Sequence, residues 1–217
     1  MTDPCSRSAT VHRPIYPHIG RFINPCTSTC FFLRYKSPIS DKIDAVSIST
    51  PDHTHAPASI MAMELNKHVY CQKPLTHHVS EARAMKKLAE EKNLVTQMGI
   101  QVHSFYDYKL ATLLIKSGII GKVRSVRAWS PKNWGYDGPA PIGEDSIPNS
   151  LDWNLWLGTA KERPYKEKIY HPGMWRKLVD FGCGTLGDMG VHIFDTPYNA
   201  LEPVSYTHLT LPTSDLV

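Results

Sequence analysis

The chain has 217 residues and a formal net charge of +4, with 24 basic and 20 acidic side chains interspersed along its length. This length can hold one large domain or two small ones around a buried core. No charge run favours nucleic acid, and no apolar stretch approaches the roughly eighteen residues of a membrane span, so both kinds of partner are excluded. Five irregularly spaced cysteines argue against a disulfide framework and favour a reducing, cytoplasmic compartment.

Residues 1–40 differ in composition from the rest of the chain. They contain no glutamate, a single aspartate, five basic residues and one glycine, Gly20, and no helical or strand period persists. Cys26 and Cys30 lack the partner ligands of a metal site, and the basic residues lack the apolar core of a targeting signal. We therefore predict that this segment is non-native and arises from out-of-frame or mis-assembled translation.

From residue 41 the chain alternates between strand-like and helix-like stretches. The predicted elements are a strand at 45–49, a helix at 55–66, a strand at 69–72, a helix at 80–93, a strand at 94–98 and a helix at 105–117. This alternation is typical of a doubly wound α/β sheet, in which the strands are parallel and the crossovers right-handed. We predict that residues 41–120 form the second half of a Rossmann-like domain.

Two of these helices have a clear apolar face. Ser80 is the expected N-cap of the first, and Gly118 is the expected C-terminal stop of the second. The residues expected to face inward are Ala82, Met85, Leu88 and Ala89 in the first helix and Leu110, Leu113 and Leu114 in the second. Lysines and glutamates on the opposite face of the first helix predict that it lies on the surface of the sheet.

The strand at 69–72 ends on a lysine, Lys73. Because Pro74 follows, Lys73 is pushed out of helical dihedrals into an extended or turn conformation at the carboxyl end of the strand. Ligands of open parallel sheets bind at that edge, so Lys73 is a candidate site residue. Taken alone, the Lys-Pro pair is better explained by a solvated lysine that closes a loop.

A different pattern begins at Gly121. Residues 123–130 alternate in polarity and predict the first strand of a second sheet, and 134–148, rich in Gly, Pro and Asp, predict a loop. Trp156 is expected to pack in a core, as large aromatic side chains do. A helix is predicted over 185–199, with its regular part ending near Pro197, where proline removes a backbone hydrogen bond.

Asp188 and His192 lie four residues apart, so a helix would place them on one face. A carboxylate and an imidazole so placed can act on the same substrate hydroxyl. Two alternatives are a hydrogen bond on the helix surface and a metal site completed by His171 or Cys183. Nothing resembling a closed set of four ligands surrounds the pair, which disfavours a metal.

Four segments resemble, in the same order, the Gfo/Idh/MocA family of NAD(P)-dependent sugar and inositol oxidoreductases: residues 49–55, 69–75, 97–101 and 184–195. The resemblance extends from Asp41 to Glu202. It implies a fragment of a dehydrogenase that uses NAD or NADP to transfer a hydride to or from a secondary alcohol of a sugar, inositol or related polyol. It implies a small-molecule substrate and leaves open whether the parent protein is a homo-oligomer. The family usually carries Glu-Lys-Pro where this chain has Gln72-Lys73-Pro74.

The resemblance also divides the chain and assigns residues. After 1–40 come the second half of the dinucleotide-binding domain (41–120), the start of an α+β substrate-binding domain with an open sheet (121–203) and a tail that looks like a translated sequencing adapter (204–217). The catalytic positions are Lys73, Asp188 and His192. The cofactor-lining positions are Thr50, Pro51, Asp52, His55, Gln72, Lys73 and Gln101. The substrate-contacting positions are Lys73, Trp175, Arg176, Asp188 and His192.

The chemistry of alcohol oxidation suggests a role for each catalytic side chain. A hydride leaves carbon while a proton leaves oxygen, so a base that titrates near neutrality is needed. His192 meets that requirement, and Lys73 is assigned to stabilise the developing alkoxide and contact the ribose. Asp188 is expected to orient His192 or to bind a neighbouring hydroxyl. Neutral Gln72 removes the bias that a glutamate would give toward a charged lysine.

Three further side chains near these segments have simpler interpretations. His53 and His55 form a His-x-His pair, but as residues beside a turn they are expected to make polar contacts or to be exposed to solvent. Cys71 is expected to be a small buried strand residue without a redox role.

Two other functions remain open. One is a hydrolase or lyase of the same family resemblance, in which tightly held NAD oxidises the substrate transiently, and the other is a noncatalytic sugar-binding protein. Residues 1–40 offer only one glycine, so the family's glycine-rich pyrophosphate-binding turn cannot lie there. For that reason we expect the chain as given to be inactive.

Overall fold

The computed structural model describes residues 22–23, 42–135, 138–139 and 141–202. Its elements are β1 (Phe22–Ile23), β2 (Ala45–Ile48), η3 (Asp52–Thr54), α2 (His55–Glu64), β3 (His68–Gln72), α3 (Val79–Glu91), β4 (Thr96–Gly99), α4 (Gln101–Ser104), α5 (Tyr106–Lys116), α6 (Trp153–Leu157), η4 (Met174–Lys177), α7 (Gly184–Ile193) and α8 (Asp195–Leu201). The predictions for 204–217 and for most of 1–40 fall outside the described residues. None of the helices described is long and apolar enough to cross a membrane.

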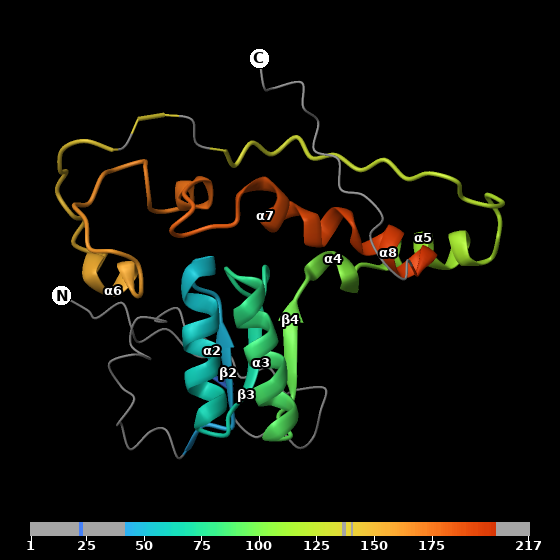
Figure 1. Cartoon of the computed structure of the whole chain (residues 1–217), viewed down its shortest axis with the longest axis horizontal. Helices are drawn as coiled ribbons and strands as arrows, with labels where there is room; N and C mark the ends of the chain where they lie inside the picture. Colours follow the sequence, from blue (N-terminus) through green and yellow to red (C-terminus); the bar gives the residue numbers. More distant parts are fainter. Residues whose placement is uncertain (1–21, 24–41, 136–137, 140, 203–217) are drawn as a thin grey trace, which may run out of the picture.

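The strands form one parallel sheet in the order β1-β2-β3-β4. Val46 pairs with Val69, and Val69 in turn pairs with Thr96. Helices α2 and α3 connect successive strands and lie side by side on one face of the sheet (Figure 1). The predicted order of strands and helices is confirmed, as is the parallel α/β class. Strand β1, from the segment predicted to be non-native, pairs in parallel with β2.

A compact apolar core lies between these two helices and the sheet. It comprises Val46, Ile48, Ala56, Ala58, Ala62, Met63, Val69, Cys71 and Met85. The strands are apolar because their side chains on this face are covered by helices. Burying a large apolar side chain such as Met85 of α3 stabilises the fold by about 1.5–3 kcal/mol. Cys71 is buried in β3 as predicted, and burial raises the pKa of its thiol to about 11.

Helix α3 has the predicted orientation but a different start. Met85 faces the core, while Lys86 and Lys87 are exposed. The N-cap is His78 and not Ser80, because the Glu81 carboxylate accepts hydrogen bonds from the backbone N–H groups of His77 at 3.1 Å and His78 at 2.8 Å. A glutamate in the first turn satisfies N–H groups that have no partner within the helix.

The region after residue 150 has its own aromatic core. Trp153, Leu157, Tyr165, Tyr170, Trp175 and Phe181 are buried together. Trp156 packs against this cluster and stacks on Trp153 with ring centroids 5.0 Å apart, so its predicted core position is confirmed. This cluster supports the segments that lead to α7, which lies beyond the carboxyl ends of the strands (Figure 1).

The predicted strand at 123–130 is not formed. This segment has no regular secondary structure, and most of its residues are exposed. A strand requires hydrogen bonds to a neighbouring strand, and in the described part of the chain all strands belong to the β1–β4 sheet. The predicted loop at 134–148 has neither helix nor strand at its described positions.

The orientation predicted for α5 is wrong. Leu110, Leu113 and Leu114 are exposed, with Leu113 at 64%. Helix α5 packs on α8 and α4 rather than on the sheet, so its leucines have no covering layer within the described residues. Gly118 does end the helix region, with a φ of +81° that glycine adopts without strain.

The helix predicted over 185–199 is divided in two. Helix α7 ends at Ile193 and α8 begins at Asp195, so the break falls at Phe194 and not near Pro197. Pro197 lies in the first turn of α8, where its missing N–H costs no intrahelical bond. Asp195 begins α8, and its carboxylate contacts His103 Nδ1 of α4 at 2.9 Å.

Candidate active site

The side chains of Lys73 and Asp188 meet directly. Lys73 follows β3 and is joined to Pro74 by a cis peptide bond, while Asp188 lies in α7. Lys73 Nζ donates to Asp188 Oδ1 at 2.5 Å and to the Asp188 backbone oxygen at 2.9 Å. Both side chains are largely buried, with 14% and 9% exposed. The interpretation of Lys73 as a solvated loop lysine is therefore wrong.

Arg176 supplies a second positive charge to the same carboxylate. Its Nε lies 3.4 Å from Asp188 Oδ1, and its guanidinium stacks 4.2 Å above the Trp175 ring. Gly182 makes this position possible, because a Cβ there would lie 2.7 Å from Arg176 Cα. Burial acts to raise the pKa of Asp188, but the hydrogen bond and charge of Lys73, with help from Arg176, outweigh it and lower that pKa. Asp188 is thus held as a carboxylate.

His192 lies one turn beyond Asp188 on α7 and is buried. Burial lowers the pKa of His192, and the charge of Lys73 lowers it further, against the opposing effect of Asp188 and Asp195. Its Nδ1 is buried and has no hydrogen-bond partner among the described residues. The imidazole is therefore neutral near pH 7. Lys73, Arg176 and the Trp134 indole act on the Asp188 carboxylate, and among the described residues no hydrogen bond joins Asp188 to His192. Of the two roles expected of Asp188, orienting His192 by a hydrogen bond is therefore not seen.

The turn after β2 joins the sheet to the second region. The Asp52 carboxylate accepts from the Cys183 N–H at 3.1 Å, directly before α7, and the His53 N–H donates to the Phe181 oxygen at 3.2 Å. Burial raises the pKa of Asp52. These contacts position the start of α7, and with it Asp188, over the strand ends.

The His55 ring links the backbone after β2 to the backbone that follows Lys73. Its Nδ1 lies 2.6 Å from the Pro74 oxygen and its Nε2 lies 2.8 Å from the Thr50 oxygen. A neutral imidazole has one N–H, so only one of these contacts is a hydrogen bond from a neutral ring. Burial lowers the pKa of both His53 and His55. The two histidines make polar contacts as predicted, but the solvent-exposed alternative is wrong.

The other residues predicted to line the cofactor differ in burial and in their contacts. Gln72 Oε1 accepts the Lys73 N–H at 2.8 Å, and Thr50 Oγ1 is buried without a partner among the described residues. Pro51 contributes its carbonyl to the turn, accepting from Thr54. Gln101 is exposed at the start of α4.

Trp175 does not face the Lys73–Asp188 pair as a predicted substrate-contacting residue should. It is buried in the aromatic core, where its Nε1 donates to the Pro172 oxygen at 3.2 Å. Its contribution to the site is indirect, through the guanidinium of Arg176. A tryptophan that sequence analysis did not select, Trp134, lies beside the site instead, with Arg176 6.0 Å from its ring.

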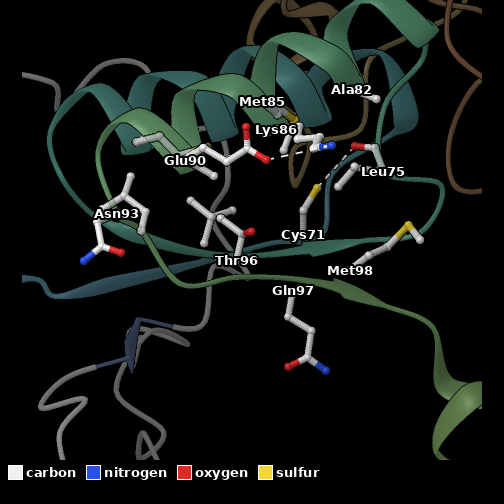
Figure 2. A pocket seen from close by; sticks show the side chains of 14 residues that line it. Cys71, Leu75, Ala82, Met85, Lys86, Glu90, Asn93, Thr96, Gln97 and Met98 are labelled. Carbon is white, nitrogen blue, oxygen red and sulfur yellow. Dashed lines mark hydrogen bonds and ion pairs between the residues drawn. The ribbon is translucent and has the colours of Figure 1, made fainter.

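A cavity of about 460 Å³ lies elsewhere, between α3 and strands β3 and β4. Figure 2 shows Cys71, Leu75 and Met85 among its lining, and none of the predicted site residues contributes to it. It opens to solvent between α3 and β4, where Glu90, Thr96 and Gln97 are exposed. Within the part of the chain that the structure describes, no three His, Cys, Asp or Glu side chains cluster closely enough to hold a metal ion.

Two models of one oxidoreductase family match the sequence. The NAD-binding Rossmann fold matches residues 27–100, and the C-terminal alpha/beta domain matches residues 106–206. The chain belongs to the Gfo/Idh/MocA family. The matches begin at residues 27 and 106, whereas the divisions predicted from the sequence are at 41 and 121; those domain boundaries remain predictions. The family's Rossmann fold agrees with the parallel sheet and its covering helices.

Individual relatives are dehydrogenases and related oxidoreductases. Levoglucosan dehydrogenase of Pseudarthrobacter phenanthrenivorans is 29% identical over 82% of this chain and 38% of its own length. The scyllo-inositol 2-dehydrogenase (NAD(+)) of Bacillus subtilis is 36% identical over 37% of this chain and 23% of its own. The crystal structure of an oxidoreductase domain protein from Kribbella flavida matches 79% of this chain and 38% of that one with a TM-score of 0.53 and 27% identity. The chain thus spans less than two fifths of these proteins.

Proposed function

We propose that this chain is a fragment carrying part of the active site of an NAD(P)-dependent oxidoreductase, which transfers a hydride between the nicotinamide and a secondary alcohol of a sugar, inositol or related polyol. The observation that carries the proposal is the contact between Lys73, at a strand end, and Asp188 of α7, beside a buried neutral His192. Because the chain spans 38% of the levoglucosan dehydrogenase, we assign the activity to the complete enzyme, meaning a protein in which these residues are joined to a pyrophosphate-binding turn.

The strand ends fit the nicotinamide side of a dinucleotide. Thr50 Oγ1 is a buried hydroxyl without a partner among the described residues, just after β2. Asp52 follows the same strand, and Gln72 provides a polar group at the end of the neighbouring strand β3. Carboxyl ends of parallel strands are where this fold class binds its ligands. We propose that Thr50, Pro51, Asp52, His55, Gln72, Lys73 and Gln101 line this site. The bound nicotinamide supplies the hydride acceptor.

His192 is proposed to take the proton of the substrate hydroxyl. It is buried, uncharged near neutral pH, and has an imidazole nitrogen that no protein group occupies among the described residues. A base of this kind contributes on the order of 10²–10⁴ to the rate. In the reverse direction the protonated imidazole returns the proton to the carbonyl oxygen.

Lys73 is proposed to stabilise the alkoxide that forms as the proton leaves. An ammonium group has three donors, and two of them are directed at Asp188. The third has no acceptor among the described residues and can donate to the substrate oxygen. Asp188 holds the Lys73 ammonium in place, and can accept from a neighbouring substrate hydroxyl.

A second function in the same family is favoured by one relative. The 2,7-anhydro-N-acetylneuraminate hydratase of Escherichia coli is 31% identical over 86 residues of this chain. We therefore keep, as the alternative, a hydrolase or lyase in which NAD is reduced and reoxidised within one turnover.

One experiment separates these functions from each other and from simple sugar binding. The complete enzyme is mixed with NAD or NADP and a panel of hexoses, anhydrosugars and inositols, and nicotinamide absorbance and product are followed together. Net reduction supports the dehydrogenase. Product without net reduction supports the alternative. Binding without either result would contradict both enzymatic proposals.

A further inference from the structure

Trp134 is held at the start of α7 by the segment that precedes it. Its backbone N–H donates to Thr185 Oγ1 at 2.8 Å, and that hydroxyl donates to the Lys132 oxygen at 3.0 Å. Thr185 lies in the first turn of α7, one turn before Asp188. The exposed segment at 121–135 is therefore anchored at this point, and the indole is placed over the catalytic helix.

Two cationic side chains lie near the indole ring of Trp134. Lys132 Nζ lies 5.8 Å and the Arg176 guanidinium 6.0 Å from its centre. The indole is also close enough to help lower the pKa of Asp188, although its Nε1 makes no geometrically acceptable hydrogen bond. Cations over an indole face are attracted to the ring, so these contacts fix its orientation.

The indole nitrogen of Trp134 differs from those of two core tryptophans. Trp153 Nε1 donates to the Arg163 oxygen at 2.7 Å, and Trp175 Nε1 donates to the Pro172 oxygen at 3.2 Å. Trp134 Nε1 is equally buried from solvent, but it makes no well-formed hydrogen bond among the described residues, and the acceptor beside it is the Asp188 carboxylate. An indole N–H can only donate, and a buried donor whose hydrogen bond is poorly formed is costly, so a packing role alone does not explain its position beside Asp188.

We propose that Trp134 Nε1 donates to a substrate oxygen next to the hydroxyl that is oxidised, which makes Trp134 a specificity-determining residue. The inference rests on the proposed function of the same site. A hydroxyl group can accept from Trp134 while it donates to the Asp188 carboxylate, whereas a methylene group can do neither. The site therefore selects a vicinal diol, as found in cyclic polyols, over the corresponding deoxy compound.

The test uses Trp134→Phe in the complete enzyme, which keeps the aromatic ring and removes only the N–H. Two substrates are compared: the polyol in the panel that reduces the nicotinamide fastest, and its deoxy analogue without the neighbouring hydroxyl. We expect kcat/KM for the polyol to fall by about tenfold or more, the size of one lost hydrogen bond, and that for the analogue to change little. Equal losses for both substrates, or no loss for either, would overturn the inference.

A binding measurement keeps the test independent of turnover. The indole N–H resonance that disappears in Trp134→Phe is followed by NMR while the polyol is added to the enzyme with bound nucleotide. A shift that the deoxy analogue does not produce supports the role of Trp134 even if no hydride is transferred, in which case only the proposed function fails. Hydride transfer without such a shift overturns the role of Trp134 alone, and absence of both overturns both. Trp153→Phe is the matched control, expected to lower stability without changing the preference for the diol.

Discussion

The sheet region, residues 45–99, and the region from 101 to 202 cover their apolar surfaces differently. In the first, Val69 and Met85 are buried between strands and helices. In the second, Leu113 is 64% exposed and Trp129 81% exposed, and the buried aromatic residues gather in one cluster. Periodic apolar residues show which face of a helix or strand is apolar. Whether that face is buried depends on another element that packs against it. The candidate site lies where the two regions meet.

The largest predicted effect is on catalysis at the site where the two regions meet. Replacing Lys73 by Met in the complete enzyme removes the ammonium that contacts Asp188, and we expect kcat to fall by about 10²–10³ or more. Initial rates of nicotinamide reduction measure it. Lys87→Met, on the exposed face of α3, is the control and should keep full activity. A Lys73→Met enzyme with more than a tenth of the normal rate would remove Lys73 from the mechanism.

Two alanine variants test whether the apolar side chains of α3 and α5 differ in burial. Met85→Ala leaves a cavity in the sheet core and should lower the free energy of unfolding by about 2–5 kcal/mol. Leu113→Ala removes a side chain that is already exposed and should change it by no more than about 0.5 kcal/mol. Urea unfolding of the chain measures both. Similar losses at the two positions would show that α5 is covered in solution.

Acid should lower the free energy of unfolding, because three histidines at or near the site are buried. His53, His55 and His192 each have a folded pKa below the ordinary value, with burial as the main cause, so the unfolded chain binds more protons below about pH 6.5. Stability is therefore lost as pH falls through that value. We expect a lower urea midpoint at pH 5.5 than at pH 7.5. An equal or higher midpoint at pH 5.5 would contradict the buried, neutral state of these histidines.

The smallest effect is at the start of α3. Glu81→Gln weakens the hydrogen bonds from the N–H groups of His77 and His78 and should cost about 0.5–1 kcal/mol. Glu90→Gln, on the exposed face of the same helix, is the control. Equal midpoints for the two variants in urea would show that the first-turn hydrogen bonds contribute no net stability.

Much of the sheet region was predictable from sequence because its local signals agree. Several local signals indicate the same parallel sheet with surface helices. They are the β-rich runs, Pro74 after the strand and the lysine–glutamate face of α3, and together they place Lys73 at a strand end. Asp188 and His192 were identifiable because their spacing of four residues matches a helical turn. The contact between Asp188 and Lys73 could not be derived from local patterns, since the two residues are 115 positions apart in the chain.

The errors have a common physical cause. Leu110 and Leu113 form a correct helical stripe, but no local signal states what packs against it. Residues 123–130 alternate like a strand, yet strand formation depends on a partner. Trp134 lies in a loop without periodicity, so only its contacts with Thr185 and Arg176 distinguish it from a surface aromatic.

The pKa of His192 tests the central claim most directly, because that claim is that Lys73, Asp188 and His192 share one site. NMR titration of the His192 ring is compared in the unmodified chain, Lys73→Met and the control Lys87→Met. Since the charge of Lys73 lowers the pKa of His192, its removal should raise that pKa, while the control leaves it unchanged. A His192 pKa that is the same in all three proteins would contradict the shared site.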